Sequence, residues 1–221
     1  MKTLSCLLFV SLLLVVTASA YQPPSGPMLK KAEKTATFNG ATPLEWSVRM
    51  ADSQMSRLDD RLAWKEGGKA RWDYTAGLFT LSLLKLNEVK PDERYVNFVT
   101  NAIGSFIDDD GNIHGYKAEE YQLDAINPGK TVIALWVLTG DEKYQKCATL
   151  LRKQLDDQPR TPEGGFWHKQ RYTNQMWLDG LYMAEPFYAE YTKLLDETPD
   201  EYEDIGKIIL LGLKQIRQAG Y

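Results

Sequence analysis

Cysteine and histidine are scarce in this sequence of 221 residues, since each occurs only twice. Cys6 lies in a predicted signal peptide, so the mature chain would keep Cys147 alone and could form no intrachain disulfide. Cys147 lies in an apolar helical stretch, which favours a buried structural thiol over a nucleophile. The scarcity also argues against a zinc site. The acidic run at 108–112 has the spacing of a calcium loop but lacks the later glutamate, so we expect a turn there.

Basic clusters and a membrane-spanning run are also missing. The formal net charge is −4, and without a basic patch the chain is not expected to bind nucleic acid. The apolar run at 7–16 is too short for a membrane span. Lys2 precedes the run and an Ala-x-Ala-like cleavage site follows it at 18–20, so residues 1–20 are predicted to be a signal peptide. We therefore expect a secreted or periplasmic mature chain that starts near Tyr21 and has no membrane partner after cleavage.

A convincing strand pattern is absent as well, and helix signals recur instead. Residues 21–41, rich in Pro, Lys, Gly and Thr, are predicted to be a flexible leader. The sequence Thr42-Pro43-Leu44-Glu45 combines a capping box with proline at the first helical position, which predicts a helix start. Periodic apolar residues and end signals then predict seven helices: 43–61, from 73, from 91, up to Gly140, 141–157, 180–195 and from 198.

Successive predicted helices alternate with short and long connections, which indicates antiparallel helical hairpins. An α-solenoid and an α/α barrel both fit such a pattern, but the chain has no strict repeat, and this favours the barrel. The longer connections precede the second, fourth and sixth helices. Every second helix therefore presents its N-terminus to the same end of the fold, as in an α/α toroid with its site at one mouth.

Aromatic residues are plentiful: the chain has six tryptophans and twelve tyrosines. They favour a carbohydrate or another flat-faced ligand, although most of them could simply fill a helical core. The densest stretch, 164–187, mixes large apolar side chains with an acid, an imidazole, amides and cations, which suits a cleft that grips a sugar ring. Trp167, Tyr172 and Trp177 could stack on sugar faces or belong to the core. Arg160 and Arg171 could pair with an anionic ligand or form structural salt bridges.

Asp124 and Asp179 are each predicted to lie just before a helix, where an aspartate most often serves as an N-cap. Asn127, before Pro128, is the better cap for the fourth helix, which leaves Asp124 free to point elsewhere. If both acids face one cleft, their like charges raise one pKa, and that carboxyl can donate a proton near neutral pH. A helix N-terminus has the opposite effect, because it stabilises the carboxylate anion and so lowers the pKa. His168 could contact a substrate hydroxyl or be a structural histidine.

Three motifs together resemble glycoside hydrolase family 105, the unsaturated rhamnogalacturonyl hydrolases. They are Asp124-Ala-Ile-Asn-Pro-Gly-Lys130, then Pro159-Arg-Thr161 with Gly164-Gly-Phe-Trp-His-Lys169, and Tyr172-Thr-Asn-Gln-Met-Trp-Leu-Asp-Gly-Leu-Tyr-Met-Ala-Glu-Pro-Phe187. The likeness runs from about Trp46 to the C-terminus and is most specific between 164 and 187. The related unsaturated glucuronyl hydrolases match these motifs less well.

The resemblance implies an (α/α)6 barrel that acts on a 4,5-unsaturated galacturonyl residue linked to rhamnose, as left by pectin lyases. The reaction would be hydration of the enol ether double bond, with no metal or organic cofactor. By position in the motifs, Asp179 matches the family's acid/base, Asp124 its second essential carboxylate and His168 a substrate contact. Trp167, Tyr172, Trp177 and Arg171 are the further candidates for binding the sugar.

The chain departs from the family in one respect, because the barrel needs twelve helices in six pairs and only about seven are predicted. Residues 42–221 are thus expected to be the N-terminal portion of the toroid, a partial (α/α)6 barrel that is inactive or aggregates when expressed alone. Two other functions stay open. A helical module that binds oligosaccharide or protein would show affinity without turnover. Another α/α-barrel sugar enzyme, such as an epimerase, would rely on histidine, and the chain offers His114 and His168.

Overall fold

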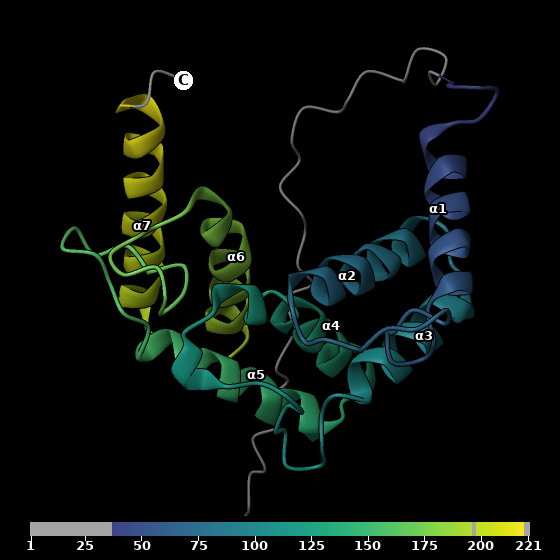
Figure 1. Cartoon of the computed structure of the whole chain (residues 1–221), viewed down its shortest axis with the longest axis horizontal. Helices are drawn as coiled ribbons and strands as arrows, with labels where there is room; N and C mark the ends of the chain where they lie inside the picture. Colours follow the sequence, from purple (N-terminus) through teal and green to yellow (C-terminus); the bar gives the residue numbers. More distant parts are fainter. Residues whose placement is uncertain (1–36, 196–197, 219–221) are drawn as a thin grey trace, which may run out of the picture.

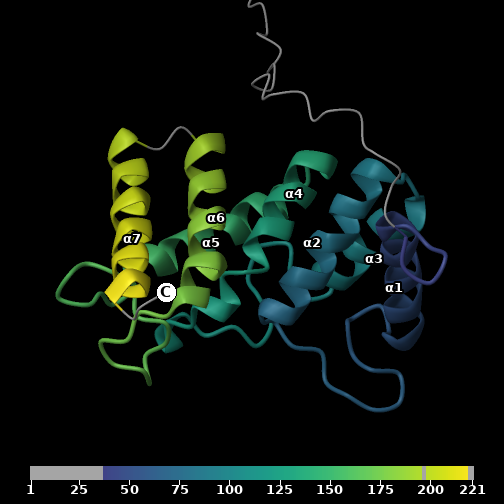
Figure 2. The ribbon, with the colours of Figure 1, turned by 90° about the horizontal axis from the view of Figure 1, so that it is seen from above.

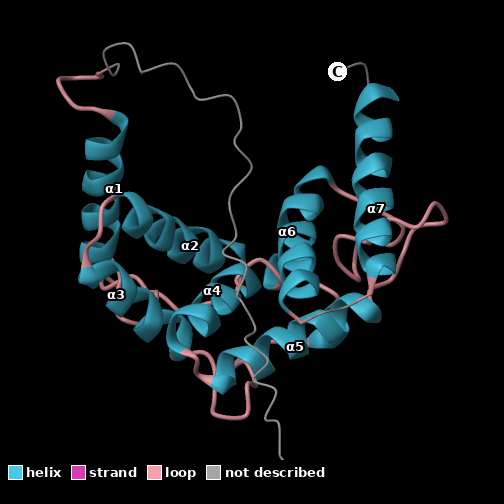
Figure 3. Cartoon of the chain, turned by 180° about the vertical axis from the view of Figure 1, so that it is seen from behind, coloured by secondary structure: helices cyan, strands magenta, loops and turns pink. Residues whose placement is uncertain are grey.

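The computed structural model describes residues 37–195 and 198–218, which form seven α-helices, two short 3-10 turns and no β-strand (Figure 3). The predicted signal peptide and residues 21–36 of the predicted leader lie outside these residues. The described end of that leader is tied to the first helix, since the Trp46 indole N–H donates to the Phe38 carbonyl at 2.9 Å. None of the described helices combines the length and the apolar character that crossing a membrane requires.

The helices follow one another as an open arc (Figure 1). They are α1 (Pro43–Arg57), α2 (Tyr74–Val89), α3 (Glu93–Gly104), α4 (Gly129–Thr139), α5 (Glu142–Asp156), α6 (Leu178–Leu194) and α7 (Pro199–Gln218). The main packing pairs are α2 with α3, α4 with α5 and α6 with α7, so successive helices form hairpins. α4 also contacts both α2 and α6, and these three helices line the inner side of the arc. The predicted all-α class, a partial (α/α)6 barrel of helical hairpins, is confirmed.

Local side-chain chemistry fixes most helix ends. Glu45 donates its backbone N–H to the Thr42 hydroxyl at 3.3 Å, and Thr42 donates its own N–H to the Glu45 carboxylate at 2.7 Å. This reciprocal pair is the predicted capping box of α1. Aspartate side chains accept backbone N–H groups at the starts of α2, α3 and α5: Asp73, Asp92 and Asp141. Gly140 ends α4 in the left-handed region, with φ 69°.

Two predictions about the end of α1 and the start of α4 are wrong. α1 ends at Arg57 rather than near residue 61, because Leu58 has an extended backbone and forms an isolated bridge with Trp64. Asn127 does not cap α4. Its fully buried side chain instead donates to the Met183 sulfur at 3.2 Å, and Pro128 holds the N-cap position. A tertiary contact has therefore replaced the local capping bond that the sequence suggested.

The core lies beneath the inner helices and continues into the outer ones. Val132, Ile133 and Leu135 of α4 are each at most 1% exposed, because α4 is covered by α2, α5 and α6. Cys147 of α5 is fully buried, and this burial raises the pKa of its thiol. The predicted burial of this thiol is confirmed.

The two ends of the arc keep apolar side chains on the surface. An open groove of about 1030 Å³ lies along α1 and α2, and its lining includes Met50 at 69% exposure and Leu78 at 48%. At the other end, α7 exposes Leu210 and Leu213, at 66% and 48%. α1 and α7 are amphipathic and α2 is apolar nearly all round, and each end keeps an apolar side without a neighbour among the residues that the structure describes.

Candidate active site

Two long chain segments meet to form the candidate site. Figure 2 shows the segments that precede α2, α4 and α6 on the same side of the arc, as the alternation of loop lengths predicts. The backbone N–H of Leu123 donates to the His168 carbonyl at 3.1 Å, and the N–H of Gln170 donates to the Glu120 carbonyl at 3.0 Å. These bonds join the segment before α4 to the segment before α6, which carry Asp124 and His168.

Two buried glutamines from the end of α5 brace this junction. The side-chain amide of Gln158, only 3% exposed as a residue, donates at 2.8 Å to the carbonyls of both Tyr121 and Trp167. The side chain of Gln154 donates to the side-chain oxygen Oε1 of Gln158 at 3.0 Å and accepts from the Tyr116 hydroxyl at 2.6 Å. Neither glutamine is predicted from the sequence, because a glutamine near a helix end carries no recognisable local signal.

Asp124 lies in a 3-10 turn (Leu123–Ala125) and is held by two donors. Its Oδ1 is 3.3 Å from Nε2 of His168, and its Oδ2 is 2.6 Å from the Lys169 ammonium nitrogen. Burial opposes ionisation of this carboxyl, but the bonds from His168 and Lys169 outweigh it and hold its pKa below the ordinary value. Asp124 is therefore an anion near neutral pH. Lys169 was not among the predicted site residues.

His168 is only 1% exposed, and its ring stacks on the indole of Trp177 with centroids 4.5 Å apart and planes 6° apart. Since Nε2 faces the Asp124 carboxylate, Nε2 is assigned as the protonated nitrogen. Nδ1 is buried and has no hydrogen-bond partner in the described part of the chain. Gly180 packs against it: a Cβ at position 180 would lie 3.3 Å from Nδ1. His168 thus orients Asp124 from a fixed ring position.

Asp179 lies in the first turn of α6. The predicted position just before the helix is therefore wrong. Trp177 holds the N-cap position with no side-chain bond, so Asp179 is not a helix cap either. The residue is exposed, and within residues 37–195 and 198–218 no hydrogen bond or ion pair engages its carboxylate. One oxygen of Asp179, one of Asp124 and a His168 nitrogen all lie within 4.8 Å of one another. The structure thus brings the two predicted acids together, and their catalytic roles stay a prediction.

The aromatic candidates divide into two groups. Tyr172 stacks on Trp177, with ring centroids 4.6 Å apart, and the Arg171 guanidinium lies over the Tyr172 ring at 4.8 Å. His168 stacks on the same indole, so the three rings form one stack beside the acids, and Trp177 is 37% exposed. Trp167 is half-buried, and no ring contact joins it to this stack among the residues described. Tyr172, Trp177 and Arg171 therefore lie together in one stack, whereas Trp167 is set apart from them, and contact of any of the four with a sugar stays a prediction.

The cluster of Asp124, His168 and Asp179 is compact enough to surround a cation. However, the Lys169 ammonium already lies 2.6 Å from Asp124, and a positive charge at that distance opposes binding of a divalent ion. The donor set fits proton transfer between acids better than metal ligation.

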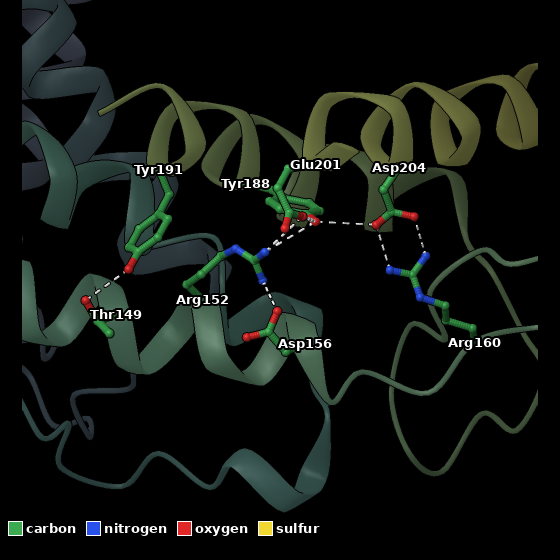
Figure 4. Close-up of polar contacts among 8 residues, drawn as sticks. All are labelled: Thr149, Arg152, Asp156, Arg160, Tyr188, Tyr191, Glu201 and Asp204. Atoms are coloured by element: carbon green, nitrogen blue, oxygen red, sulfur yellow. Dashed lines mark hydrogen bonds and ion pairs between the residues drawn. The ribbon is translucent and has the colours of Figure 1, made fainter. Parts of the chain in front are cut away.

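A second polar network fastens the segment before α6 to α7 (Figure 4). Arg160 forms two bonds to the Asp204 carboxylate, at 2.8 and 2.7 Å, so it is a structural cation and not a ligand-binding one. Arg152 of α5 pairs with Glu201 of α7, and Glu201 also accepts from the Tyr188 hydroxyl of α6. The Arg160 bonds fix the segment that carries His168 and Lys169 against α7, and the bonds to Glu201 join α7 to α5 and α6.

Comparison with known proteins identifies relatives of this geometry. Residues 46–215 match the family model of Glycosyl Hydrolase Family 88. A glycoside hydrolase of family 105 from C. acetobutylicum ATCC 824 is 41% identical, with a TM-score of 0.67, and the match covers 75% of this chain and 44% of that one.

Two more distant structures share the fold. They are possible family 105 members from Klebsiella pneumoniae subsp. pneumoniae MGH 78578 and from Salmonella enterica subsp. enterica serovar Paratyphi A str. ATCC 9150. Each is 18% identical with a TM-score of 0.60, and the matches cover 90% and 88% of this chain. This chain spans only 53% and 52% of their lengths, and 44% of the first relative.

Proposed function

Because this chain belongs to Glycosyl Hydrolase Family 88, with family 105 enzymes as its solved relatives, we propose that it carries catalytic residues of an unsaturated rhamnogalacturonyl hydrolase. The substrate is a 4,5-unsaturated galacturonyl residue linked to rhamnose. One observation supports this most directly: Asp124 and Asp179 lie together, one bound by two donors and one open. Such asymmetry is what a site with one proton donor and one fixed anion requires.

In this proposal Asp179 is the general acid. Its carboxyl gives a proton to C4 of the C4=C5 double bond, and positive charge develops at C5 and the ring oxygen. Water then adds at C5 and loses a proton to the Asp179 carboxylate, which restores the acid. The resulting hemiketal opens and releases the neighbouring sugar. The Asp124 anion stabilises the developing positive charge, since it lies close to Asp179 and is ionised near neutral pH.

The stacked rings supply the binding surface. Trp177 stacks on Tyr172 but stays 37% exposed, and we assign this exposed part of the indole to packing against a sugar ring. Arg171 is exposed above Tyr172 and is the cation that we assign to the uronate carboxylate.

We also propose that the protein is secreted after cleavage near Tyr21, which N-terminal sequencing of the secreted product would check.

The decisive assay incubates the natural gene product with a lyase-generated unsaturated galacturonyl-rhamnose disaccharide. Ultraviolet absorbance of the conjugated double bond should fall with time. Asp179→Asn should reduce the rate by roughly 10²–10⁴-fold, as expected for loss of a general acid. Asp200→Asn is the matched control, because Asp200 is also an exposed aspartate in the first turn of a helix, α7. Full activity in Asp179→Asn would reject the assignment.

The same assay separates the alternatives. An unsaturated glucuronyl hydrolase would consume the corresponding glucuronyl disaccharide faster than the galacturonyl one. A non-catalytic binding module would bind the disaccharide without any loss of absorbance, and Trp177→Ala would then weaken binding while Asp179→Asn left it unchanged.

A further inference from the structure

Lys169 is a charged side chain of the site that the proposed chemistry leaves without a role. Its ammonium nitrogen lies 2.6 Å from Oδ2 of Asp124, and only 14% of its side chain is exposed. The ion pair joins the segment before α6 to the turn before α4. It therefore links the two chain segments that build the site.

The two acids of the site have unequal surroundings. Asp124 receives a donor on each oxygen, His168 on Oδ1 and Lys169 on Oδ2. Asp179 faces Asp124 from α6, and the described residues give its carboxylate neither a hydrogen bond nor an ion pair. An ammonium in contact with one carboxylate stabilises negative charge on that carboxylate. Lys169 thus separates two acids that would otherwise compete for one proton.

We propose that Lys169 is a positioning residue that keeps Asp124 ionised and aligned with His168, so that Asp179 alone carries the proton to the substrate. This inference rests on the proposed function. A compact ammonium suits the task because it occupies one carboxylate oxygen and leaves the other to His168. A guanidinium would offer two parallel donors and compete with His168 for Oδ1.

The first test follows the Asp124 carboxyl itself in the natural gene product labelled with [¹³Cγ]aspartate. The signal that disappears in Asp124→Asn identifies the group in carbon NMR spectra recorded against pH. Lys169→Met keeps the length of the side chain but removes its charge, and the titration midpoint of Asp124 should rise by about one pH unit or more. Lys169→Arg keeps the charge and should return the midpoint toward its original value.

The matched control is Lys207→Met, which removes an exposed lysine from α7 that lies 3.5 Å from Glu203. It should leave the Asp124 midpoint unchanged. Helix content from circular dichroism shows whether each variant is folded. An Asp124 midpoint that is the same in folded Lys169→Met as in the unsubstituted chain overturns the proposal.

The second test measures removal of the double bond by the natural gene product as a function of pH. Lys169→Met should lower kcat at least about tenfold at neutral pH, with a smaller change in KM, and should move the acidic limb of the profile to higher pH. A purely structural lysine would lower the active fraction without moving that limb. If the unsubstituted protein shows no turnover either, the proposed function has failed, and the NMR titration still decides the role of Lys169.

Discussion

Glu185 of α6 shows, at the scale of one residue, how burial changes the chemistry of an acid. It is only 4% exposed, and its Oε2 has no hydrogen-bond partner in the described part of the chain. Burial, reinforced by the Asp204 charge, raises its pKa to about 8, and Arg160 opposes this only in part. The folded chain therefore keeps the proton on Glu185 at a pH where the unfolded chain has released it.

This difference predicts that stability falls as pH rises. The unfolded carboxyl titrates near 4.5, so stability present below that pH is lost progressively as the pH approaches 8. Glu185→Gln keeps the shape of the neutral acid and cannot ionise. It should raise the free energy of unfolding at pH 9 by on the order of 2–4 kcal/mol, and change it little at pH 4.5.

Urea unfolding at several pH values measures this effect. Glu203→Gln is the control, since the Glu203 side chain is 71% exposed on α7. A stability curve for Glu185→Gln that runs parallel to that of the unsubstituted chain from pH 5 to 9 would show that Glu185 is not the titrating group.

Some of the candidate site could be predicted residue by residue, and some could not. Asp124, Asp179 and His168 stand out because acids and an imidazole among aromatics are unusual for a core, and the structure brings all three together. Lys169 and Gln158 were missed, because their importance depends on which chain segment lies opposite them. From the sequence alone, a lysine next to a histidine is interpreted as a solvated surface charge. Its ion pair with Asp124 is evident only from the structure.

At the scale of helices, a glycine can allow two elements to pack more closely than a larger side chain would permit. Gly77 of α2 faces the segment before α4 so closely that a Cβ would lie 2.4 Å from the Asn127 side chain and 2.6 Å from the Pro128 nitrogen. One of those neighbours is backbone and cannot move aside easily. Gly206 of α7 has open space around the same position. The two glycines are both helical and differ only in what surrounds them.

Alanine at these two positions should therefore have opposite effects. Gly77→Ala should lower the free energy of unfolding by roughly 1–3 kcal/mol, because overpacking outweighs the gain in helix propensity. Gly206→Ala should raise it by up to about 1 kcal/mol, since only the propensity term remains. Thermal unfolding of the two variants measures the contrast, and equal changes of the same sign would contradict the packing argument.

Helix ends followed from sequence wherever the deciding bond is local. Thr42, Asp73 and Asp141 bond to N–H groups two or three residues away, so the pattern and the structure agree. Asn127 failed as a predicted cap because its partner, Met183, is 56 residues away. A contact with another part of the chain also accompanies the wrong prediction for Asp179. Trp177 holds the N-cap position of α6 and packs its ring on His168, so Asp179 lies inside the first turn.

At the scale of the whole molecule, helix count and loop alternation predicted an arc of hairpins, but local patterns cannot say what covers the ends of the arc. The groove along α1 and α2 and the helix α7, which lie at opposite ends of the arc in Figure 1, both expose apolar residues. Contiguous apolar surface of this kind favours association, because burying it removes it from water. We expect the 221-residue chain, by itself, to form dimers or larger species as its concentration rises.

Light scattering after size-exclusion chromatography tests this expectation. Charges placed in the groove by Met50→Glu with Leu78→Glu should shift the chain toward monomer, since a buried unpaired carboxylate is costly. Arg61→Glu is the control for the change of charge, because Arg61 is 70% exposed and lies outside the groove lining. A chain that stays monomeric at every concentration would mean that the two apolar edges are too small or too far apart to pair. Association that the groove substitutions leave unchanged would instead point to the α7 edge, where Leu210→Glu is the next variant to measure.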